Sequence, residues 1–538
     1  MKKILTSVMA CACLVGFSAC DSFLDEAPRS ELTSNNYYLS EAHAKQNVNY
    51  LYRTGVPARL SSTGAYQGSI AQIQGALTGY FTNTYEGQEL TYKYGREMTR
   101  QQNTMTVGVA LGGEWDAAYK AINVANSAIK YIPGINNINA ETAATLVAEA
   151  KFFRAWNYFF LVKLFGDVPF YTEPVESADT DMMLPRTAKA TVYTQIESDL
   201  ADAVAALPAK TFADNDHRVG KFAAAMLLAD VNFYQGDYAE AATAIKTVLT
   251  SDHALTAHKK DITAANYEEN KLESAWNQLR TTDDLAECIY AYEYDGSISK
   301  ASRWAPMAFD ASILAWGDAC KYSICERIYG PVSYYLNVYE AGDMRALPNQ
   351  FYHWEFTHPD NAKLTWKREA DKGPGAWYFY TYEDMLVNGY SAKDRNLYRY
   401  AEALLIGAEA IAQSSGVTAE AAGYLAEVKA RANMEGKTVA AIATELQALS
   451  AQAFIEECWK ERLRELPFDF KIWDDIVRTK KFPVISKTTQ GDVTFVDTFN
   501  GQTTNASGAT IKDSDLLWPI SPDELQRNPS LTQNPGYN

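Results

Sequence analysis

The chain has 538 residues, which is enough for two or more ordinary domains or for one large helical body with a sizeable core. Its formal net charge is -17, and 34 Tyr and 11 Trp help to raise the aromatic share to 12%. A surface this acidic repels phosphate, so the charge argues against nucleic-acid binding and against a polybasic patch that docks on membranes.

The first twenty residues have the layout of an export signal. Two lysines precede an apolar run that ends at Phe17 and is too short to cross a membrane. The letters FSAC that close it resemble the lipobox of bacterial lipoproteins, in which the cysteine is acylated, although Phe stands at the usual Leu. This resemblance implies a signal peptide over residues 1–19, lipidation of Cys20 and a tether over residues 20–40; a plain secretory signal is the alternative. Acyl chains contribute roughly 0.8 kcal/mol per buried methylene, so several of them would anchor the protein to a membrane.

Four helices are predicted in the first part of the body that follows. Apolar residues recur there at three- and four-residue spacing, over Glu41–Arg53, Glu114–Tyr131, Thr142–Leu164 and Val192–Leu207. Proline, or glycine and proline together, follows each of the last three, and such residues end helices.

Two later segments have the pattern of helix hairpins. In Lys221–Thr250, Ala225 and Ala229 are small enough for two helices to approach closely, and a Gly-Asp-Tyr turn separates the halves. This resembles a tetratricopeptide hairpin, and Tyr398–Gln413 with Ala421–Asn433 forms a similar pair. Such pairs cannot bury their faces singly and must stack. We therefore predict an α-helical scaffold, with repeats over about 41–53, 114–280 and 395–480.

Two long regions, residues 54–113 and 281–392, do not follow the helical pattern. The first is rich in Gly, Thr, Gln and Tyr, and the second contains five tryptophans. Structureless segments of this length are uncommon inside a compact protein unless they are functional. We expect them to form short helices and strands laid over the scaffold, within one body that spans residues 41–538 and ends in a tail over 481–538.

The stretch ECWKERLRELPFDFKIWDDIVR, Glu457–Arg478, gathers acids and bases around two tryptophans. Glu457, Glu461 and Glu465 follow one another at four-residue spacing and share one helix face. A glycosidase needs two carboxylates that face each other about 5–10 Å apart across a cleft, and three acids along one helix do not provide this. Because basic residues flank these acids, the sequence predicts ion pairs instead.

The same stretch resembles the C-terminal signature of the SusD/RagB family of outer-membrane nutrient-binding lipoproteins. The usual run of that family is matched by Glu461-Arg462, Glu465-Leu466, Phe468-Asp469, Trp473, Asp475-Ile476 and Arg478. Two positions depart from it, since Phe470 stands where Gly is common and Ile472 where Arg is common. Other segments are similar to the family in the same order along the chain: Cys20–Pro28, Glu114–Asn126, Ala148–Pro169, Arg399–Ala410 and Leu517–Tyr537.

This resemblance implies an all-α fold, in which tetratricopeptide-like helix pairs form a scaffold and a long irregular, loop-rich subdomain packs on it. It implies a lipid-anchored protein on the cell surface, at the outer membrane, with a SusC-like TonB-dependent transporter as partner. Proteins of this family capture an oligosaccharide, less often a peptide, for import, and they have no catalytic residues. We therefore expect a carbohydrate-binding protein that is not an enzyme and needs no cofactor.

Capture of a neutral sugar calls for aromatic rings flanked by short polar groups, on loops that a rigid scaffold holds. The stretch Gly79–Glu97 has this composition and supplies the candidates Tyr80, Asn83, Tyr85, Glu86, Tyr92 and Arg96. The second irregular region adds Tyr294, Trp304 and Trp316. Composition and placement alone select these residues, and any of the rings could instead fill a core.

Other kinds of site find little support in the sequence. The histidines form no HExxH or His/Cys cluster, so we expect no metal centre. Cys288, Cys320, Cys325 and Cys458 match no zinc spacing; we interpret them as buried thiols, with a Cys320–Cys325 bridge as the alternative. Peptide capture, an α-helical glycoside hydrolase or lyase, and a purely structural helical adaptor remain as alternative functions.

Overall fold

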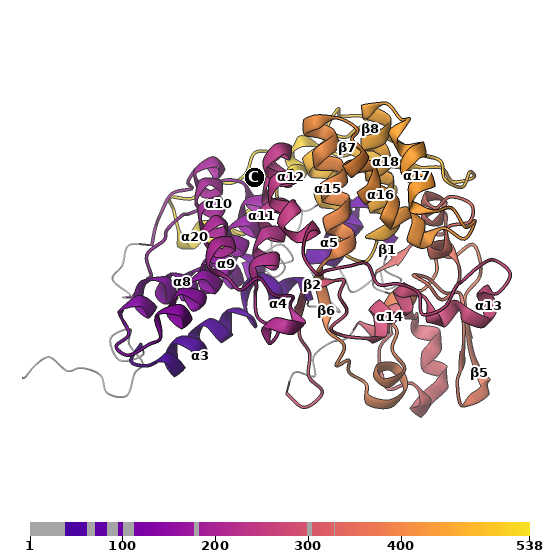
Figure 1. Ribbon diagram of the computed structural model, residues 1–538, viewed down its shortest axis with the longest axis horizontal. Helices are drawn as coiled ribbons and strands as arrows, with labels where there is room; N and C mark the ends of the chain where they lie inside the picture. The colour runs from indigo at the N-terminus through magenta and orange to yellow at the C-terminus, as the bar shows by residue number, and fades with distance from the viewer. Residues whose placement is uncertain are drawn as a thin grey trace, which may run out of the picture.

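The computed structural model describes residues 38–61, 70–82, 95–99, 112–176, 182–298, 304–325, 327 and 329–537. Helices dominate it (Figure 1). They are α3 (Glu41–Leu51), α4 (Gly55–Ser61), α5 (Ile70–Thr78), α8 (Gly113–Tyr131), α9 (Ala140–Phe165), α10 (Lys189–Ala206), α11 (Lys221–Gln235), α12 (Tyr238–Leu249), α13 (Tyr267–Asn270), α14 (Ala275–Thr281), α15 (Tyr400–Ser415), α16 (Ala419–Ala432), α17 (Val439–Gln447), α18 (Ala451–Glu465), α19 (Ile472–Thr479) and α20 (Pro522–Arg527). The predicted all-α fold class is confirmed. Among the described residues, no helix combines the length and the apolar character that a membrane crossing needs.

The strands are short and pair two by two. They are β1 (Phe81–Thr82), β2 (Cys288–Tyr292), β3 (Gly330–Pro331), β4 (Glu355–His358), β5 (Asn361–Lys367), β6 (Arg395–Arg399), β7 (Lys481–Ile485) and β8 (Val493–Asp497). The pairs β1–β3, β2–β6, β4–β5 and β7–β8 are all antiparallel. Three of them include a strand from the region between α14 and α15, so they tie this irregular region to itself and to the scaffold.

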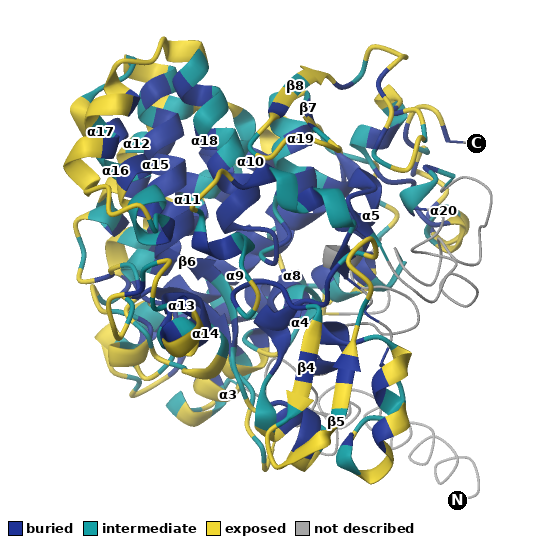
Figure 2. Ribbon diagram, turned by 90° about the vertical axis from the view of Figure 1, so that its right-hand side faces the viewer, coloured by how far each residue is buried: buried dark blue, intermediate teal, exposed yellow. Residues whose placement is uncertain are grey.

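Helix α9 is the central helix of the first half of the scaffold. Asn139 caps its N-terminus, because the side-chain oxygen accepts hydrogen bonds from the N–H groups of Glu141 and Thr142. Gly166 follows its last turn with φ +71°, and a Cβ at this position would lie 2.9 Å from Leu517 Cδ1. Most α9 residues are buried, since α8 and α10 pack along it, within the interior that Figure 2 colours dark blue.

Both predicted helix hairpins are present. Helices α11 and α12 join at Gly236, which has φ +87°, and Ala225 and Ala229 are fully buried on α11. Helices α15 and α16 form the second pair. A Cβ on Gly407 of α15 would lie 2.8 Å from Leu249 Cδ1 of α12, so glycine lets these helices approach closely. The two pairs therefore stack directly on each other, as the repeat pattern predicts.

The irregular region between α14 and α15 has a core of its own. Its described part consists of short 3-10 and π turns and short strands. Phe309, Trp316, Phe356, Trp366 and Trp377 are buried together there. Trp316 stacks on Phe356 with 5.7 Å between ring centroids, and Trp366 meets Phe309 edge-on at 5.1 Å. Much of the aromatic excess of this region is thus used for packing.

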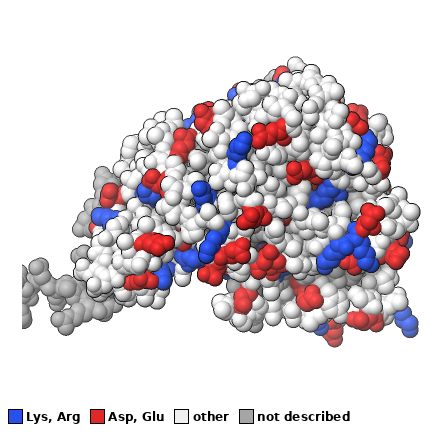
Figure 3. All heavy atoms as spheres, viewed as in Figure 1, with Lys and Arg blue, Asp and Glu red and all other residues white. Residues whose placement is uncertain are grey.

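The structure tests the predictions for the cysteines but not those for the start of the chain. The four cysteines of the described residues, Cys288, Cys320, Cys325 and Cys458, are free and buried, so the alternative bridge between Cys320 and Cys325 is not formed. The predicted signal peptide and Cys20 lie outside the described residues, and so does most of the tether. Acidic and basic side chains are interspersed over the face shown in Figure 3.

Candidate functional site

Two acids of the stretch Glu457–Arg478 are fully buried on α18. Arg345 contacts the carboxylates of Glu461 and Glu465 at 2.7 and 3.0 Å, and Arg431 contacts Glu465 at 2.7 Å. Burial by itself raises the pKa of Glu461, but Arg345 and the cations around it outweigh this effect and lower the pKa to about 2. A carboxylate that stays ionised cannot serve as a general acid. The prediction that these acids form ion pairs is confirmed.

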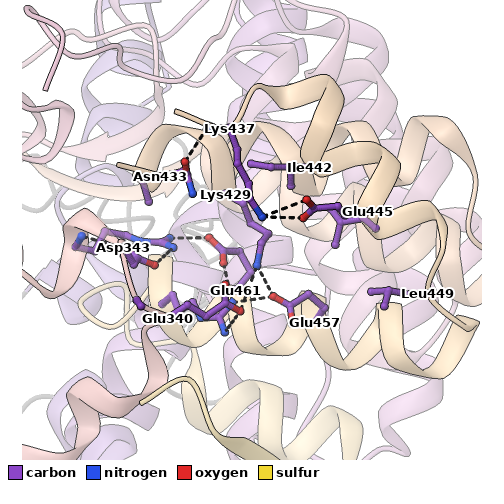
Figure 4. Close-up of a pocket in the computed structure, with 15 residues that line it drawn as sticks. Glu340, Asp343, Lys429, Asn433, Lys437, Ile442, Glu445, Leu449, Glu457 and Glu461 are labelled. Carbon is purple, nitrogen blue, oxygen red and sulfur yellow. Dashed lines mark hydrogen bonds and ion pairs between the residues drawn. The ribbon is translucent and has the colours of Figure 1, made fainter. Parts of the chain in front are cut away.

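The pocket in Figure 4, of about 240 Å³, lies over this ion network between α16, α17 and α18. Glu457 pairs there with Arg464 at 2.8 Å and also with Lys429. Lys437 reaches the carboxylate of Glu445 at 3.1 and 3.2 Å across the opening. Because these walls neutralise each other, a charged ligand could enter only by breaking ion pairs. The pocket is therefore a poor binding site for a charged ligand, and its side chains stabilise the scaffold instead.

Arg399 joins two parts of the family pattern in space. It stands at the end of β6 and contacts Glu287, Glu465 and Asp469 at 2.8, 3.1 and 2.8 Å. Arg399 begins one of the matched segments, and Glu465 and Asp469 belong to the C-terminal signature. These motif residues thus hold the second helix hairpin to α18.

The C-terminal half of the signature makes a second set of buried contacts. Arg478 of α19 forms a bidentate pair with Glu409 of α15, at 2.7 and 2.8 Å, and also binds Asp475 at 2.8 Å. Asp475 accepts a further bond from Arg462 at 2.7 Å. The side chain of Arg478 is 3% exposed and that of Glu409 is fully buried. This half of the signature therefore fixes α19 onto the scaffold.

Three of the aromatic ligand candidates are packing residues. Tyr80 is 3% exposed, and its hydroxyl donates to Pro483 O at 2.7 Å and accepts from Ile485 N at 3.1 Å. Trp304 is 5% exposed and Trp316 is 8% exposed. Rings buried this far cannot offer a face to a sugar, so the structure corrects the expectation that these three are open platforms.

Tyr294 is half-buried and lies where several irregular segments meet. Its hydroxyl and the indole N–H of Trp304 both donate to Ser61 O at 3.1 Å, at the end of α4. Tyr294 N donates to Asp394 Oδ1 at 2.8 Å. Burial, and then the neighbouring Asp283, raise the pKa of Asp394 to about 7. The cavity beside Trp304 measures about 40 Å³, which is room for a few water molecules and not for a sugar.

The remaining candidates flank or occupy a segment outside the described part. Arg96 Nη2 lies 3.7 Å from Glu97 Oε1, and the backbone carbonyl of Arg96 accepts a hydrogen bond from Asn505 Nδ2 at 2.7 Å. Asn83, Tyr85, Glu86 and Tyr92 lie outside the described residues, as does Cys20. The frame fixes the two points from which this segment departs, since Val332 N also donates to Tyr80 O at 2.8 Å.

A much larger groove, of about 790 Å³, lies where α9, α10, α11 and α19 meet the C-terminal tail. Sequence reasoning missed it, because its walls come from helix ends that are far apart along the chain. The only available signal was the specific pattern Leu517–Tyr537, whose residues Leu517 and Gly536 form part of the wall.

Comparisons with known proteins agree with this architecture. A family profile described as "SusD family" matches residues 357–537, and one described as "Starch-binding associating with outer membrane" matches residues 22–234. SusD-like protein P2 of Formosa agariphila is 26% identical over 565 aligned positions that cover 100% of both chains. SusD-like protein P38 of the same organism is 23% identical, with 100% of this chain and 99% of that protein covered.

Solved structures share the fold. A SusD superfamily protein from Parabacteroides distasonis superposes with a TM-score of 0.75 at 23% identity and covers 94% of this chain and 100% of that one. Surface glycan-binding protein A from Bacteroides thetaiotaomicron, solved in complex with laminarihexaose, superposes with a TM-score of 0.65 at 17% identity, covering 92% and 99% of the two chains. From the two profile matches, the relatives and the fold together, the chain belongs to the SusD/RagB family.

Proposed function

We propose that this protein captures oligosaccharides at the cell surface and passes them unchanged to a SusC-like TonB-dependent transporter. Lipid on Cys20 would hold it at the outer membrane. The observation that carries the proposal is the fold match over 92% of this chain to a surface glycan-binding protein that was solved with laminarihexaose. The family profile that names starch binding in association with the outer membrane supports the same location.

The absence of catalysis is part of the proposal. The stretch that most resembles catalytic machinery is the acidic run on α18, and its carboxylates are held by guanidinium groups. Glu461, with a pKa near 2, cannot donate a proton at neutral pH. These acids therefore stabilise the scaffold.

The ligand face that we propose includes Tyr294 and Arg96, together with Asn83, Tyr85, Glu86 and Tyr92 from the segment between β1 and Arg96. The support is that rigid parts of the frame hold both ends of this segment. One or two stacked rings contribute about 1–2 kcal/mol each by area, and hydrogen bonds largely replace those to water. After the cost of association, dissociation constants from about millimolar to micromolar follow. Weak binding suits a protein that must release its ligand.

Calorimetry with the mature protein tests the proposal. We expect binding to at least one member of a panel of neutral laminari-, malto-, xylo- and manno-oligosaccharides, with no new reducing ends after prolonged incubation. Tyr85→Ala and Tyr294→Ala should weaken binding about fivefold or more. Tyr424→Ala is the matched control, because that ring lies on α16 and bonds to Glu420 at 2.9 Å. New reducing ends would refute the non-catalytic part, and binding of a peptide panel alone would refute the sugar.

Location and partner need separate measurements. Cys20→Ala should move the protein from the outer-membrane fraction to the soluble fraction, while Cys288→Ser should leave it in place. Purification of the lipidated protein from its native membrane should recover a TonB-dependent transporter in equal amount. A protein that stays membrane-bound without Cys20 would contradict the lipid anchor.

A further inference from the structure

The groove of about 790 Å³ is a built feature and not a gap between loops. The C-terminal tail forms one wall, and the ends of α9, α11 and α19 and the start of α10 form the others. Pro535 and Gly536 of the tail line the groove together with the start of α10 and the end of α11, both labelled in Figure 1. A cavity of this volume is within the usual range of binding sites for small ligands.

The tail wall is fixed to the scaffold by specific contacts. Trp518 is 3% exposed, and its backbone N–H donates to Leu164 O at 2.7 Å, at the end of α9. The hydroxyl of Tyr537 shares its one proton between Ser514 O and Leu517 O, both at 2.9 Å. At Gly536, with φ +85°, a Cβ would lie 2.5 Å from Ser514 Cβ. These contacts therefore fix the shape of the groove.

The side chains around the groove carry an excess of positive charge, although the chain as a whole carries -17. Of the described residues that line it, one is an acid, Asp513, and five are cations: Lys163, Lys189, Arg478, Lys480 and Lys512. Asp474 neutralises Lys163 at 2.6 Å, and the buried acids described above neutralise Arg478. Among the described residues, no ion pair engages Lys189, Lys480 or Lys512. These three ammonium groups are exposed at the rim.

The floor offers hydroxyl groups and hydrocarbon. The rings of Tyr193 and Tyr234 line the groove, and their hydroxyls make no hydrogen bond within the described part of the chain. Burial raises the pKa of both above its usual range, so both hydroxyls remain donors. Val162, Val477 and Leu516 supply apolar walls. The groove thus combines apolar surface, two hydrogen-bond donors and a rim of cations.

The geometry points to this groove as a second binding site, for an anionic oligosaccharide whose carboxylate or sulfate groups meet the lysines of the rim while its C–H faces lie on the apolar walls. A free acidic peptide fits less well, because extended peptides bind along strand edges, and the groove is lined by helix ends and by the tail. The site shares no residue with the face around Tyr294, so it goes beyond the proposed function.

The test compares ligands of equal length by calorimetry in 50 mM NaCl. The probes are tetragalacturonate, cellotetraose, an acetylated tetraglutamate peptide and sodium sulfate. We expect tetragalacturonate to bind at least tenfold more tightly than cellotetraose at this site, and to weaken at least threefold in 300 mM NaCl, because salt screens exposed charges. Cellotetraose binding as tightly, or affinity that salt does not change, would overturn the inference.

Matched variants locate the site. The pair Lys189→Gln and Lys512→Gln removes two rim charges but keeps most of each stem, and should lower the affinity for tetragalacturonate about fivefold. The control pair Lys246→Gln and Lys367→Gln removes the same charge from surface ion pairs on α12 and β5 and should change the affinity less than twofold. Unchanged melting temperatures establish that all variants fold.

Two more results would overturn the inference while leaving the proposed function intact. Tetraglutamate binding in place of the saccharide would make the groove a peptide site, and saturation by sulfate without saccharide binding would leave an ion site only. Loss of tetragalacturonate binding in Tyr294→Ala, with no loss in the lysine pair, would assign the anion to the other face. The proposed function fails separately, if no neutral oligosaccharide binds at all.

Discussion

Phe470 occupies a backbone conformation that favours glycine. Its φ is +61°, and the side chain is 7% exposed. The ring meets Tyr329 edge-on with 4.6 Å between centroids, and it lies 5.6 Å from Trp304 and 6.4 Å from Phe379. The family pattern commonly has Gly at this position. In this chain the packing of the ring must outweigh the backbone strain.

Substitution of Phe470 by Ala and by Gly separates the packing of the ring from the strain of the backbone. A left-handed conformation costs a residue with a Cβ about 1–2 kcal/mol. Removing a buried Phe ring costs about 3–5 kcal/mol. Phe470→Ala loses the ring and keeps the strain, so the free energy of unfolding should fall by about 3–5 kcal/mol. Phe470→Gly loses the ring and relieves the strain, so it should be more stable than the Ala variant by about 1 kcal/mol.

Differential scanning calorimetry can measure this difference. For a chain of this length that unfolds as one unit, 1 kcal/mol shifts the melting temperature by about 1 °C. Phe468 is the control, because it is fully buried close by and has a negative φ. There the Ala variant should be the more stable of the two, by about 0.4–1 kcal/mol. If Ala exceeds Gly at both positions, the strain argument for Phe470 is wrong.

Three further predictions concern the ion network and the tail. Glu461 has a folded pKa of about 2 against an ordinary value of 4.5, so its ionised form stabilises the fold by about 3 kcal/mol above pH 5. This stabilisation is lost as the pH falls from 5 toward 2. In calorimetry at several pH values, Glu461→Gln should lower the melting temperature at pH 7 and make the melting temperature depend less on pH below 5. Glu409→Ala leaves the buried guanidinium of Arg478 without its bidentate partner, so the free energy of unfolding measured in urea should fall by about 3–5 kcal/mol. Glu445→Ala removes a surface ion pair and should lower it by less than about 1 kcal/mol. Similar losses in the two variants would refute the argument. Gly536→Ala and Gly501→Ala both place a Cβ at positive φ, but only the first meets a neighbouring side chain, so limited proteolysis should release the C-terminal tail in the first variant alone.

The helices were predictable because their signals are local. The periodicity over Glu114–Tyr131 predicts α8 to within one residue, and Gly236 and the small residues of α11 predict the first hairpin. The ion pairs of α18 were also predictable in kind, because acids and bases share the helix. Their partners were not, since Arg345 lies 116 residues before Glu461.

The fate of the aromatic residues was not predictable from composition. Tyr80 looks like a ligand platform in sequence, with short polar residues after it, and its burial depends on Pro483, 403 residues away. Trp316 is buried because β4 and β5 fold back over it, which no local pattern states. The groove was missed for the same reason, because each of its walls is by itself only a helix end or a stretch of the tail.

The motifs that identify the family and the residues that would select a ligand occupy different positions. Arg399, Glu465 and Asp469 belong to the matched segments, and their contacts with one another and with Glu287 hold the scaffold together. Leu517 and Gly536 also lie in a matched segment, and they build the wall of the groove.

The three unpaired lysines of the rim, Lys189, Lys480 and Lys512, fall between these segments. They stand on the surface of the same frame, so their charge can change without disturbing the buried pairs that stabilise it. The frame is thus fixed by buried ion pairs, and the charge of the rim is set by exposed lysines. The matched segments therefore supply the tail wall of the groove, and residues between them supply the charge of its rim.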